Sequence, residues 1–272
     1  MARSRDTDAC PGALQVHQAA DGALVRVRLP GGRIAAAQLG VLAEASTRFG
    51  SGTLELTSRG NVQLRGITEV ATVAAAIAEA GLLPSATHER VRNIVASPLS
   101  GRAGGNADIR DWVDELDAAI CAEPRLAGLG GRFWFSLDDG RGDVSGLAAD
   151  VGVHVYDDGC ALTLAGRDTG TRVGDVTATL VRMALRFIEV RGKHWRITEL
   201  SDLDVLLPGM QPGAAFPPAT MPPVGWIAQD DGRVTVGAAV PLGYCPPGSP
   251  STWPRSRLPG GHAVAILADL RS

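Results

Sequence analysis

The sequence predicts an α+β protein with at least two lobes. Segments whose apolar residues alternate at every second position, as in strands, are interleaved with segments of helical spacing. The 34 glycines and 17 prolines indicate many tight turns. Residues 208–223 are rich in proline and glycine, which is typical of a linker between lobes.

The first lobe has the predicted order strand, helix, strand, strand, helix. These elements are expected at residues 22–30, 34–49, 53–57, 61–67 and 69–81. The two central strands form a β-hairpin around Ser58-Arg59-Gly60, with one apolar and one polar face. A last strand before Arg90 would complete the split βαβ, or ferredoxin-like, arrangement.

The second lobe begins near Glu89 with a strand-like segment and a loop. An amphipathic helix is expected at 109–120, opened by Asp108. The remaining predicted elements are strands at 132–137, 151–156 and 160–166, a long helix at 173–192, and two short strands within 223–244. The strands at 151–156 and 160–166 are joined by an Asp-Asp-Gly turn.

Composition narrows the class of protein. The chain has 272 residues, enough for about two domains, and a formal net charge of −3. This charge argues against a protein that coats nucleic acid or anionic membrane. No apolar run reaches the roughly 18 residues of a membrane span, and the first residues lack the apolar core of a secretory signal. We therefore expect a cytoplasmic protein with neither nucleic acid nor membrane as a partner.

The cysteines and histidines give no metal motif by spacing. Cys10, Cys121, Cys160 and Cys245 form no C-x-x-C pair and are expected to be free thiols. The five histidines are not paired at helical spacing. The Asp-Asp-Gly runs lack the spaced oxygen ligands of a calcium loop and are expected to be turns. No metal site is predicted.

Basic and amide side chains gather on the polar face of the predicted hairpin and after it. They are Arg59, Asn61, Gln63, Arg65, Arg90, Arg92, Asn93, Arg102 and Arg132. Arginine presents a planar fork of donors that binds carboxylates bidentately and keeps its charge near neutral pH. In one cleft, these residues would suit a ligand with several carboxylates. From the residues alone, the alternative of a solvated hairpin face stays open.

Two stretches carry a family resemblance. LELTSRGNVQLRGI (54–67) and ERVRNIVASPLSG (89–101) resemble the repeated halves of the sirohaem-dependent nitrite and sulfite reductases. Within that superfamily the sequence is most similar to the precorrin-3B synthases of aerobic cobalamin synthesis. Further matching stretches are 9–32, 130–140, 149–155 and 222–243.

The resemblance implies a domain order. A nitrite/sulfite reductase ferredoxin-like half domain at 1–88 precedes a larger α+β half domain at 89–207. A linker at 208–222, the start of a second ferredoxin-like half domain at 223–244, and an aberrant or disordered tail at 245–272 follow. In the family this pair of half domains is repeated, and the repeats form a cleft for a tetrapyrrole with many carboxylates.

The resemblance also implies site residues. The hairpin arginine of the family falls on Arg59, and the arginine of its R-N-[IV] motif falls on Arg92. Two lysines of the reductases fall on Arg132 and Trp134, and the loss of one cation disfavours sulfite or nitrite as substrate. We expect Arg59, Arg92 and Arg132 to hold substrate carboxylates. Asn61 and Gln63 are expected to act as neutral donors, and no catalytic residue is assigned.

The implied reaction is oxidative. A precorrin-3B synthase hydroxylates precorrin-3A with dioxygen and reducing equivalents and closes a γ-lactone. The family uses a [4Fe-4S] cluster held by C-x₅-C and C-x₃-C cysteines, and the reductases also use sirohaem. None of the four cysteines here fits that spacing. We therefore expect no such cofactor to bind this chain alone, and expect the chain to be inactive by itself.

The last residues suggest a reason. Residues 245–272 carry five prolines where the family has a helix, which indicates either a frameshift that truncated a longer enzyme or a natural disordered tail. An uncovered half-domain face would favour self-association. Two functional alternatives stay open: a fragment of a sirohaem-dependent nitrite or sulfite reductase, and a tetrapyrrole-binding remnant without catalysis.

Overall fold

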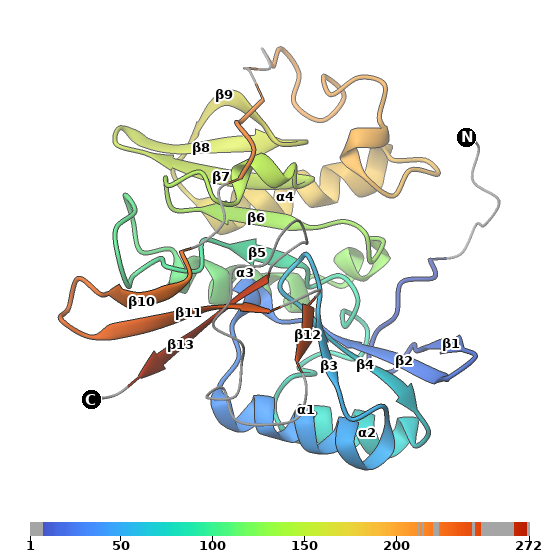
Figure 1. The fold of residues 1–272 in the computed structure, drawn as a ribbon. Coiled ribbons are helices and arrows are strands. Elements are labelled where there is room, and N and C mark those ends of the chain that lie inside the picture. Colours follow the sequence, from blue (N-terminus) through green and yellow to red (C-terminus); the bar gives the residue numbers. More distant parts are fainter. Residues whose placement is uncertain are drawn as a thin grey trace.

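The α+β class is confirmed by a computed structural model of the chain. It describes residues 8–210, 213, 215–219, 223–240, 243–245 and 264–270. Figure 1 shows a lower lobe with α1 and α2, an upper lobe with α3 and α4, and a small sheet beside them. Within the described ranges, every helix is too short or too polar to cross a membrane.

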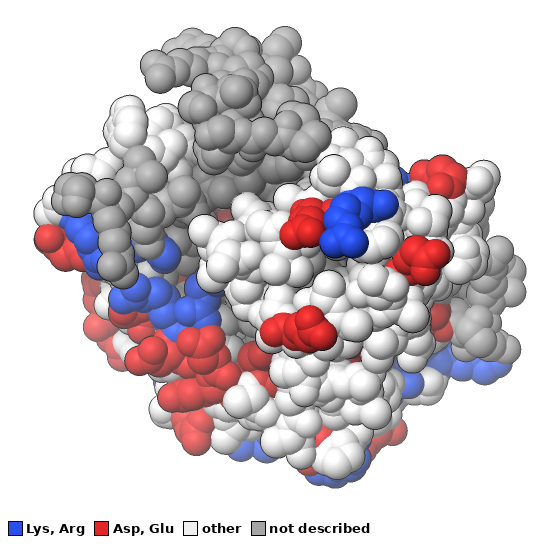
Figure 2. Space-filling model, turned by 90° about the horizontal axis from the view of Figure 1, so that it is seen from below, with Lys and Arg blue, Asp and Glu red and all other residues white. Residues whose placement is uncertain are grey.

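The lower lobe is an antiparallel sheet with two helices beneath it in Figure 1. Across the sheet, the strands are β1 (His17–Ala19), β2 (Gly22–Val27), β4 (Val62–Ile67), β3 (Leu54–Leu56) and β12 (Tyr244–Cys245). The helices are α1 (Ala36–Phe49) and α2 (Val70–Glu79). Their apolar stripes meet the sheet in a core whose centre, Val25, Leu42, Leu64 and Ile77, is fully buried. Figure 2 views the lobe from below and shows a surface that is mainly uncharged there.

The predicted hairpin and both helices of this lobe are confirmed. The predicted last strand before Arg90 is wrong. Residues 82–93 form turns and extended links, in which Val91 N–H donates to the His88 carbonyl at 3.1 Å. His88 itself is buried, and its ring contacts the Glu123 carbonyl at 3.1 Å. The place beside β2 is taken instead by β1, which pairs with it in antiparallel register.

The upper lobe is a mixed sheet covered by two helices. Its strands, in order, are β5 (Ile94–Ala96), β6 (Phe135–Asp138), β7 (Val151–Tyr156), β8 (Gly159–Leu164) and β9 (Arg167–Val173). The first three are parallel and the last three antiparallel. The helices α3 (Arg110–Ala122) and α4 (Val176–Val190) lie together behind the sheet in Figure 1.

The core of the upper lobe is larger than that of the lower lobe. Phe133 stacks on Phe187 of α4 with ring centroids 5.2 Å apart, and meets Phe135 edge-on at 5.3 Å. The helix predicted at 109–120 is confirmed as α3, and Asp108 Oδ1 accepts from Arg110 N–H in its first turn at 3.1 Å. The polar strand β9 was not predicted, because its sequence RDTGTRV lacks apolar alternation.

A third sheet lies beside the two lobes. It contains β10 (Gly225–Ala228), β11 (Val234–Val240) and β13 (Val264–Leu270), all antiparallel. The two strands predicted within 223–244 are thus present as β10 and β11. Within the tail predicted to be aberrant or disordered, the backbone of 264–270 pairs with β11, whereas 246–263 lie outside the described residues. The domain boundaries themselves stay a prediction.

Candidate functional site

Arg59 stands at the tip of the hairpin formed by β3 and β4. The tip is tight because Gly60 adopts a φ of 69°, a value that favours glycine, and a Cβ at this position would lie 3.0 Å from the Cα of Gly32. This turn carries Arg59 to the upper lobe, where its Nη1 donates to the Gly131 carbonyl at 3.4 Å. Arg59 therefore lies at the junction of the two lobes.

Trp134 lies between two guanidinium groups at this junction. The Cζ atom of Arg59 is 5.9 Å from the ring centroid, and that of Arg196 is 6.0 Å from it. Asp150 is fully buried. Its carboxylate accepts from Arg196 Nε–H at 2.7 Å and from the backbone N–H of Trp134 at 3.0 Å. Arg196, which the sequence analysis missed, thus supplies a second cation near Arg59.

The two predicted neutral donors are occupied by protein partners. Asn61 is 2% exposed; its Oδ1 accepts from Leu29 N–H at 3.0 Å, and its Nδ2 donates to Asn93 Oδ1 at 3.2 Å. Gln63 accepts from Arg26 Nη2 at 2.6 Å and donates to Glu55 Oε2 at 2.6 Å. Both amides fix β4 against its neighbours and have their hydrogen bonds within the chain.

Arg92 and Arg132 lie in opposite environments. Arg92 is buried, and its Nε and Nη2 donate to the two carboxylate oxygens of Asp117, each at 2.7 Å. This bidentate pair ties the segment before β5 to α3. Arg132 is exposed, and the described part of the chain gives it no ion pair. Of the three predicted substrate arginines, Arg59 contacts Gly131, the residue before Arg132, so these two lie near the same loop. Arg92 is instead paired with Asp117 of α3.

Arg28 is a second residue of this region, besides Arg196, that was not predicted from the sequence. It follows β2 directly and is only 2% exposed. Its Nε donates to the Arg90 carbonyl at 3.3 Å, whereas its Nη1 and Nη2 have no hydrogen-bond partner among the described residues. In the sequence, Arg28 alternates with the apolar Val25, Val27 and Leu29, and such a pattern does not reveal that both faces of the segment are covered.

Positive charge accumulates around Arg28. We name Arg26, Arg28 and Arg59 the arginine cluster. Burial lowers the pKa of all three, and the charge of Arg26 lowers that of Arg28 further, to about 9. The charge of Arg196 adds to the effect of burial on the pKa of Arg59. Each shift means that the environment disfavours the charged form, as it does where cations lack counter-ions.

An acidic counterpart occurs in the upper lobe. The carboxylates of Asp138, Asp139 and Asp143 are buried within 4.8 Å of one another. Asp138 accepts four backbone N–H groups, those of 140, 142, 144 and 145, at 2.8–3.0 Å. Asp139 forms a bidentate pair with Arg141, and Asp143 accepts from Ser97 Oγ at 2.6 Å. Protein donors fill these oxygens, which fits a structural turn rather than a metal site.

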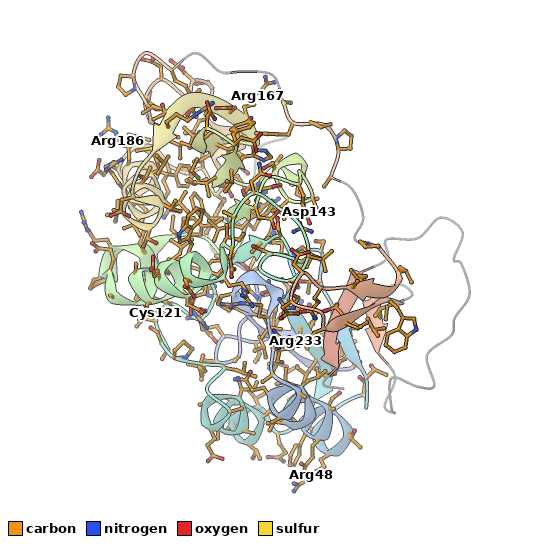
Figure 3. All side chains as sticks on the ribbon, turned by 90° about the vertical axis from the view of Figure 1, so that its left-hand side faces the viewer. Arg48, Cys121, Asp143, Arg167, Arg186 and Arg233 are labelled. Carbon is orange, nitrogen blue, oxygen red and sulfur yellow. The ribbon has the colours of Figure 1, made fainter. Side chains whose placement is uncertain are left out.

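The cysteines of the described part offer no cluster site. Cys10, Cys121 and Cys160 are free thiols, and no group of three possible metal ligands there includes a cysteine. Burial raises the pKa of each thiol, to about 11 for Cys160, which works against the thiolate form that binds iron. Figure 3 places Cys121 at the α3 side of the molecule. These residues do not fit a [4Fe-4S] cluster.

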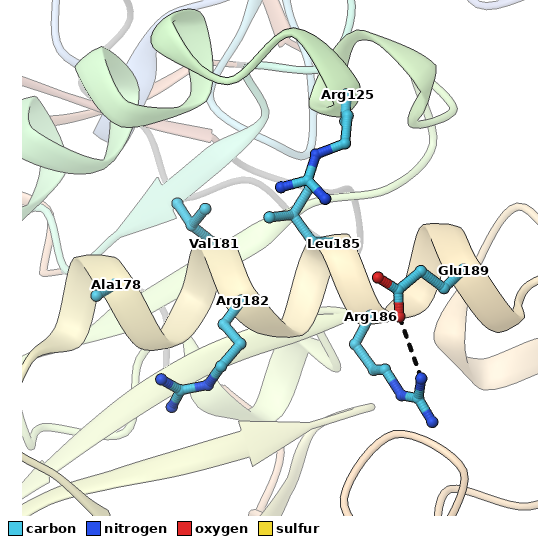
Figure 4. Close-up of a pocket in the computed structure, with 7 residues that line it drawn as sticks. All are labelled: Arg125, Ala178, Val181, Arg182, Leu185, Arg186 and Glu189. Carbon is cyan, nitrogen blue, oxygen red and sulfur yellow. Dashed lines mark hydrogen bonds and ion pairs between the residues drawn. The ribbon is translucent and has the colours of Figure 1, made fainter.

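A surface hollow on α4 provides a contrast. Figure 4 shows it lined by α4 residues and by Arg125, which lies in the 3-10 turn Pro124–Gly128 that follows α3. Its arginines have partners: Arg186 pairs with Glu189 at 3.1 Å, and Arg125 pairs with Glu123 at 2.9 Å. It lies in the upper lobe, away from the hairpin of the lower lobe in Figure 1. None of the predicted site residues lines it.

Residues 17–80 match the family described as the nitrite/sulfite reductase ferredoxin-like half domain. A precorrin-3B synthase from Sinorhizobium sp is 32% identical over 174 residues, 62% of this chain and 37% of that protein. A ferredoxin–nitrite reductase from Leptolyngbya laminosa is 37% identical over 82 residues, 29% of this chain and 16% of that protein.

Among solved structures, the fold is similar to that of the Mycobacterium tuberculosis NirA protein. The TM-score is 0.63 at 21% identity, and the similarity covers 82% of this chain and 48% of that one. The chain thus spans less than half the length of each of these relatives.

Proposed function

We propose that this chain acts as the tetrapyrrole-binding part of a precorrin-3B synthase-type oxidoreductase of the nitrite/sulfite reductase superfamily, whose ferredoxin-like half domain its residues 17–80 match. The substrate class is precorrin-3A or a related tetrapyrrole with several carboxylates. The similarity to a precorrin-3B synthase supports the choice of substrate. The observation that carries the proposal is the arginine cluster at the junction of the lobes.

In this proposal Arg59 and Arg132 bind and orient carboxylates of the macrocycle. Arg59 is held in position by the Gly131 carbonyl and by the Trp134 ring. Arg132 is exposed beside Gly131 and is free to adjust to a second carboxylate. Three other predicted residues stabilise the surrounding structure through hydrogen bonds within the chain. Asn61 bonds to Leu29, Gln63 to Glu55 and Arg92 to Asp117. No redox step is assigned to the described residues, since their cysteines do not fit the cluster.

A titration of the full chain with uroporphyrin, an octacarboxylate macrocycle, tests this proposal. We expect uroporphyrin to bind more tightly than mesoporphyrin, a dicarboxylate of similar shape, because charge-assisted bonds to arginine need carboxylates. Arg59→Gln and Arg132→Gln should each weaken binding by about tenfold, the loss of one charged hydrogen bond. Arg48→Gln is the matched control, because Figure 3 shows Arg48 at the far end of the α1 layer. Equal affinity for both macrocycles, unchanged by the variants, would contradict the proposal.

The reductase alternative has its own observation. The ferredoxin–nitrite reductase is 37% identical to this chain over 82 residues. Trp134 argues against it, because its ring is 4% exposed and occupies a position where the reductases carry a lysine. A sirohaem absorption spectrum in the purified chain would favour the reductase. Binding of uroporphyrin without any oxidation of a precorrin would favour a binding protein without catalysis.

A further inference from the structure

Arg28 is a buried charge whose terminal nitrogens are unused. The side chain is 2% exposed, and Nη1 and Nη2 lie out of contact with solvent and have no hydrogen-bond partner in the described part of the chain. A guanidinium group has five N–H donors, of which the described residues engage Nε–H, through the Arg90 carbonyl at 3.3 Å. An unpaired buried charge costs several kcal/mol, so proteins rarely keep one without a purpose.

No described carboxylate forms an ion pair or hydrogen bond with Arg28. Burial is the largest cause of its lowered pKa; the charges of Arg26 and Arg59 lower it further, and that of Glu89 opposes them. The nearby carboxylate of Glu89 is occupied, because it accepts the backbone N–H groups of residues 13, 14 and 15 at 2.6–2.9 Å. Among the described residues, Nη1 and Nη2 of Arg28 are therefore left without an acceptor, and Glu89 uses its oxygens on the backbone.

The segment 8–15, which we call the strap, lies against this place. Asp8 Oδ2 accepts from Gly131 N–H at 2.6 Å, and Arg59 donates to the carbonyl of the same glycine at 3.4 Å. The packing is close, because a Cβ on Gly131 would lie 2.7 Å from the Cβ of Cys10. Asp8 also pairs with Arg90 at 3.5 Å, and the carbonyl of Arg90 accepts from Arg28. The strap thus adjoins both Arg28 and Arg59.

We propose that Arg28 is an anion-binding residue that, together with Arg59, takes one carboxylate group of the ligand when the strap moves aside. A carboxylate suits the site because its two oxygens match the two free nitrogens of a guanidinium fork. Those nitrogens are closed to solvent in the free chain, so binding requires an adjoining segment to move, and we assign that movement to the strap because it adjoins both arginines. That the carboxylate belongs to a tetrapyrrole rests on the proposed function, whereas the anion site does not.

Thermal unfolding of Arg28→Met in the full chain tests the site, with citrate as the carboxylate probe. Without citrate, the variant should unfold at the same or a higher temperature than the wild type, because an apolar side chain of similar length removes an unpaired buried charge. Citrate should raise the midpoint of the wild type, since a ligand that binds only the folded state stabilises it. It should not raise that of the variant. Arg48→Met should behave like the wild type.

Two results would overturn the site. One is a lower midpoint for Arg28→Met together with a citrate shift equal to that of the wild type, which would make Arg28 a structural residue. The other is the absence of any citrate shift in the wild type. Should Arg28→Met not fold, Arg28→Lys keeps the charge but loses the fork. Its citrate affinity should fall by about tenfold, and an unchanged affinity would contradict the site.

Uroporphyrin separates this inference from the proposed function. If it binds the wild type, Arg28→Met should weaken it by about tenfold or more, the loss of a bidentate contact. If it does not bind but the citrate shift depends on Arg28, the proposed function fails and the anion site stands.

Asp8→Asn tests the role of the strap. The substitution weakens the contact of residue 8 with Arg90, at 3.5 Å, and should therefore speed the association of citrate with the chain. An unchanged association rate would contradict the role of the strap.

Discussion

The acidic group of the upper lobe is buried, and the arginine cluster at the lobe junction is buried at Arg28 and half-buried at Arg26 and Arg59. Each concentrates charge of one sign. They differ in whether other groups of the chain supply hydrogen-bond and ion-pair partners for these charges. Four backbone N–H groups converge on Asp138, and Arg141 pairs with Asp139. In the arginine cluster, two nitrogens of Arg28 have no partner. A charge that the protein neutralises itself indicates a structural role, whereas one left open indicates a ligand.

The largest loss of stability is expected at Asp138, the side chain that accepts the most hydrogen bonds in the acidic group. Asp138→Ala would leave four backbone N–H groups without their acceptor in a fully buried turn. We expect a loss of about 3–5 kcal/mol in the free energy of unfolding, measured by urea denaturation. Asp231→Ala, in an exposed turn of the third sheet, is the control and should change little. A near-wild-type stability of Asp138→Ala would contradict the structural role that we assign to the acidic group.

Arg92 should behave as a structural residue. Its bidentate pair with Asp117 has side-chain exposures of 5% and 19%, so Arg92→Met should lower the free energy of unfolding by about 2–3 kcal/mol. A double-mutant cycle with Asp117→Asn should show coupling between the two residues. If the two losses in the free energy of unfolding were additive and Arg92→Met directly weakened uroporphyrin binding, Arg92 would be a ligand-binding residue and not a structural one.

Asp143 should give the acidic group a measurable pH dependence. Burial is the main cause that raises its pKa from 3.8 to about 6, and the neighbouring Asp138 adds to the rise, while Ser97 and Arg141 oppose it. A raised carboxyl pKa means that the folded state holds a proton which the unfolded state has lost. Stability from this group therefore falls as pH rises from about 4 to about 6.

Asp143→Asn removes that titration. Relative to the wild type, the variant should gain about 1–2 kcal/mol in the free energy of unfolding between a pH below 4 and a pH above 6. Urea denaturation at several pH values measures this difference. A difference that does not change with pH would show that Asp143 titrates normally.

The smallest effect is expected for Arg48. It pairs with Glu44 across one turn of α1 at 3.1 Å, and both side chains are more than half exposed. Arg48→Gln should cost no more than ~0.5 kcal/mol, as is usual for an exposed i,i+4 pair. Salt should reduce the difference in urea denaturation between this variant and the wild type. A larger loss would disqualify Arg48→Gln as a control for the binding experiments.

Elements with strong periodicity could be predicted from the sequence. The hairpin at 53–67 and the helices α1 to α4 follow from apolar spacing and from glycines at turns. The strand β9 could not be predicted, because an edge strand with one exposed face needs few apolar residues. The strand expected before Arg90 did not form, since tertiary contacts of His88 and Glu89 hold that segment in turns.

The candidate site was only partly predictable. Arg59 came from the hairpin pattern and the family resemblance, and the structure places it at the lobe junction. Burial of Asn61 and pairing of Arg92 depend on Asn93 and Asp117, partners that sequence spacing does not reveal. Arg28 could not be identified, because an unused guanidinium is defined by what surrounds it in space.

A crystal structure of the full chain with uroporphyrin would show directly whether Arg28 binds a carboxylate. We expect a macrocycle carboxylate within hydrogen-bond distance of Nη1 and Nη2 of Arg28, with Arg59 on the same group and the strap displaced. A macrocycle bound elsewhere, for example on the α4 hollow of Figure 4, with Arg28 still unpaired, would contradict it.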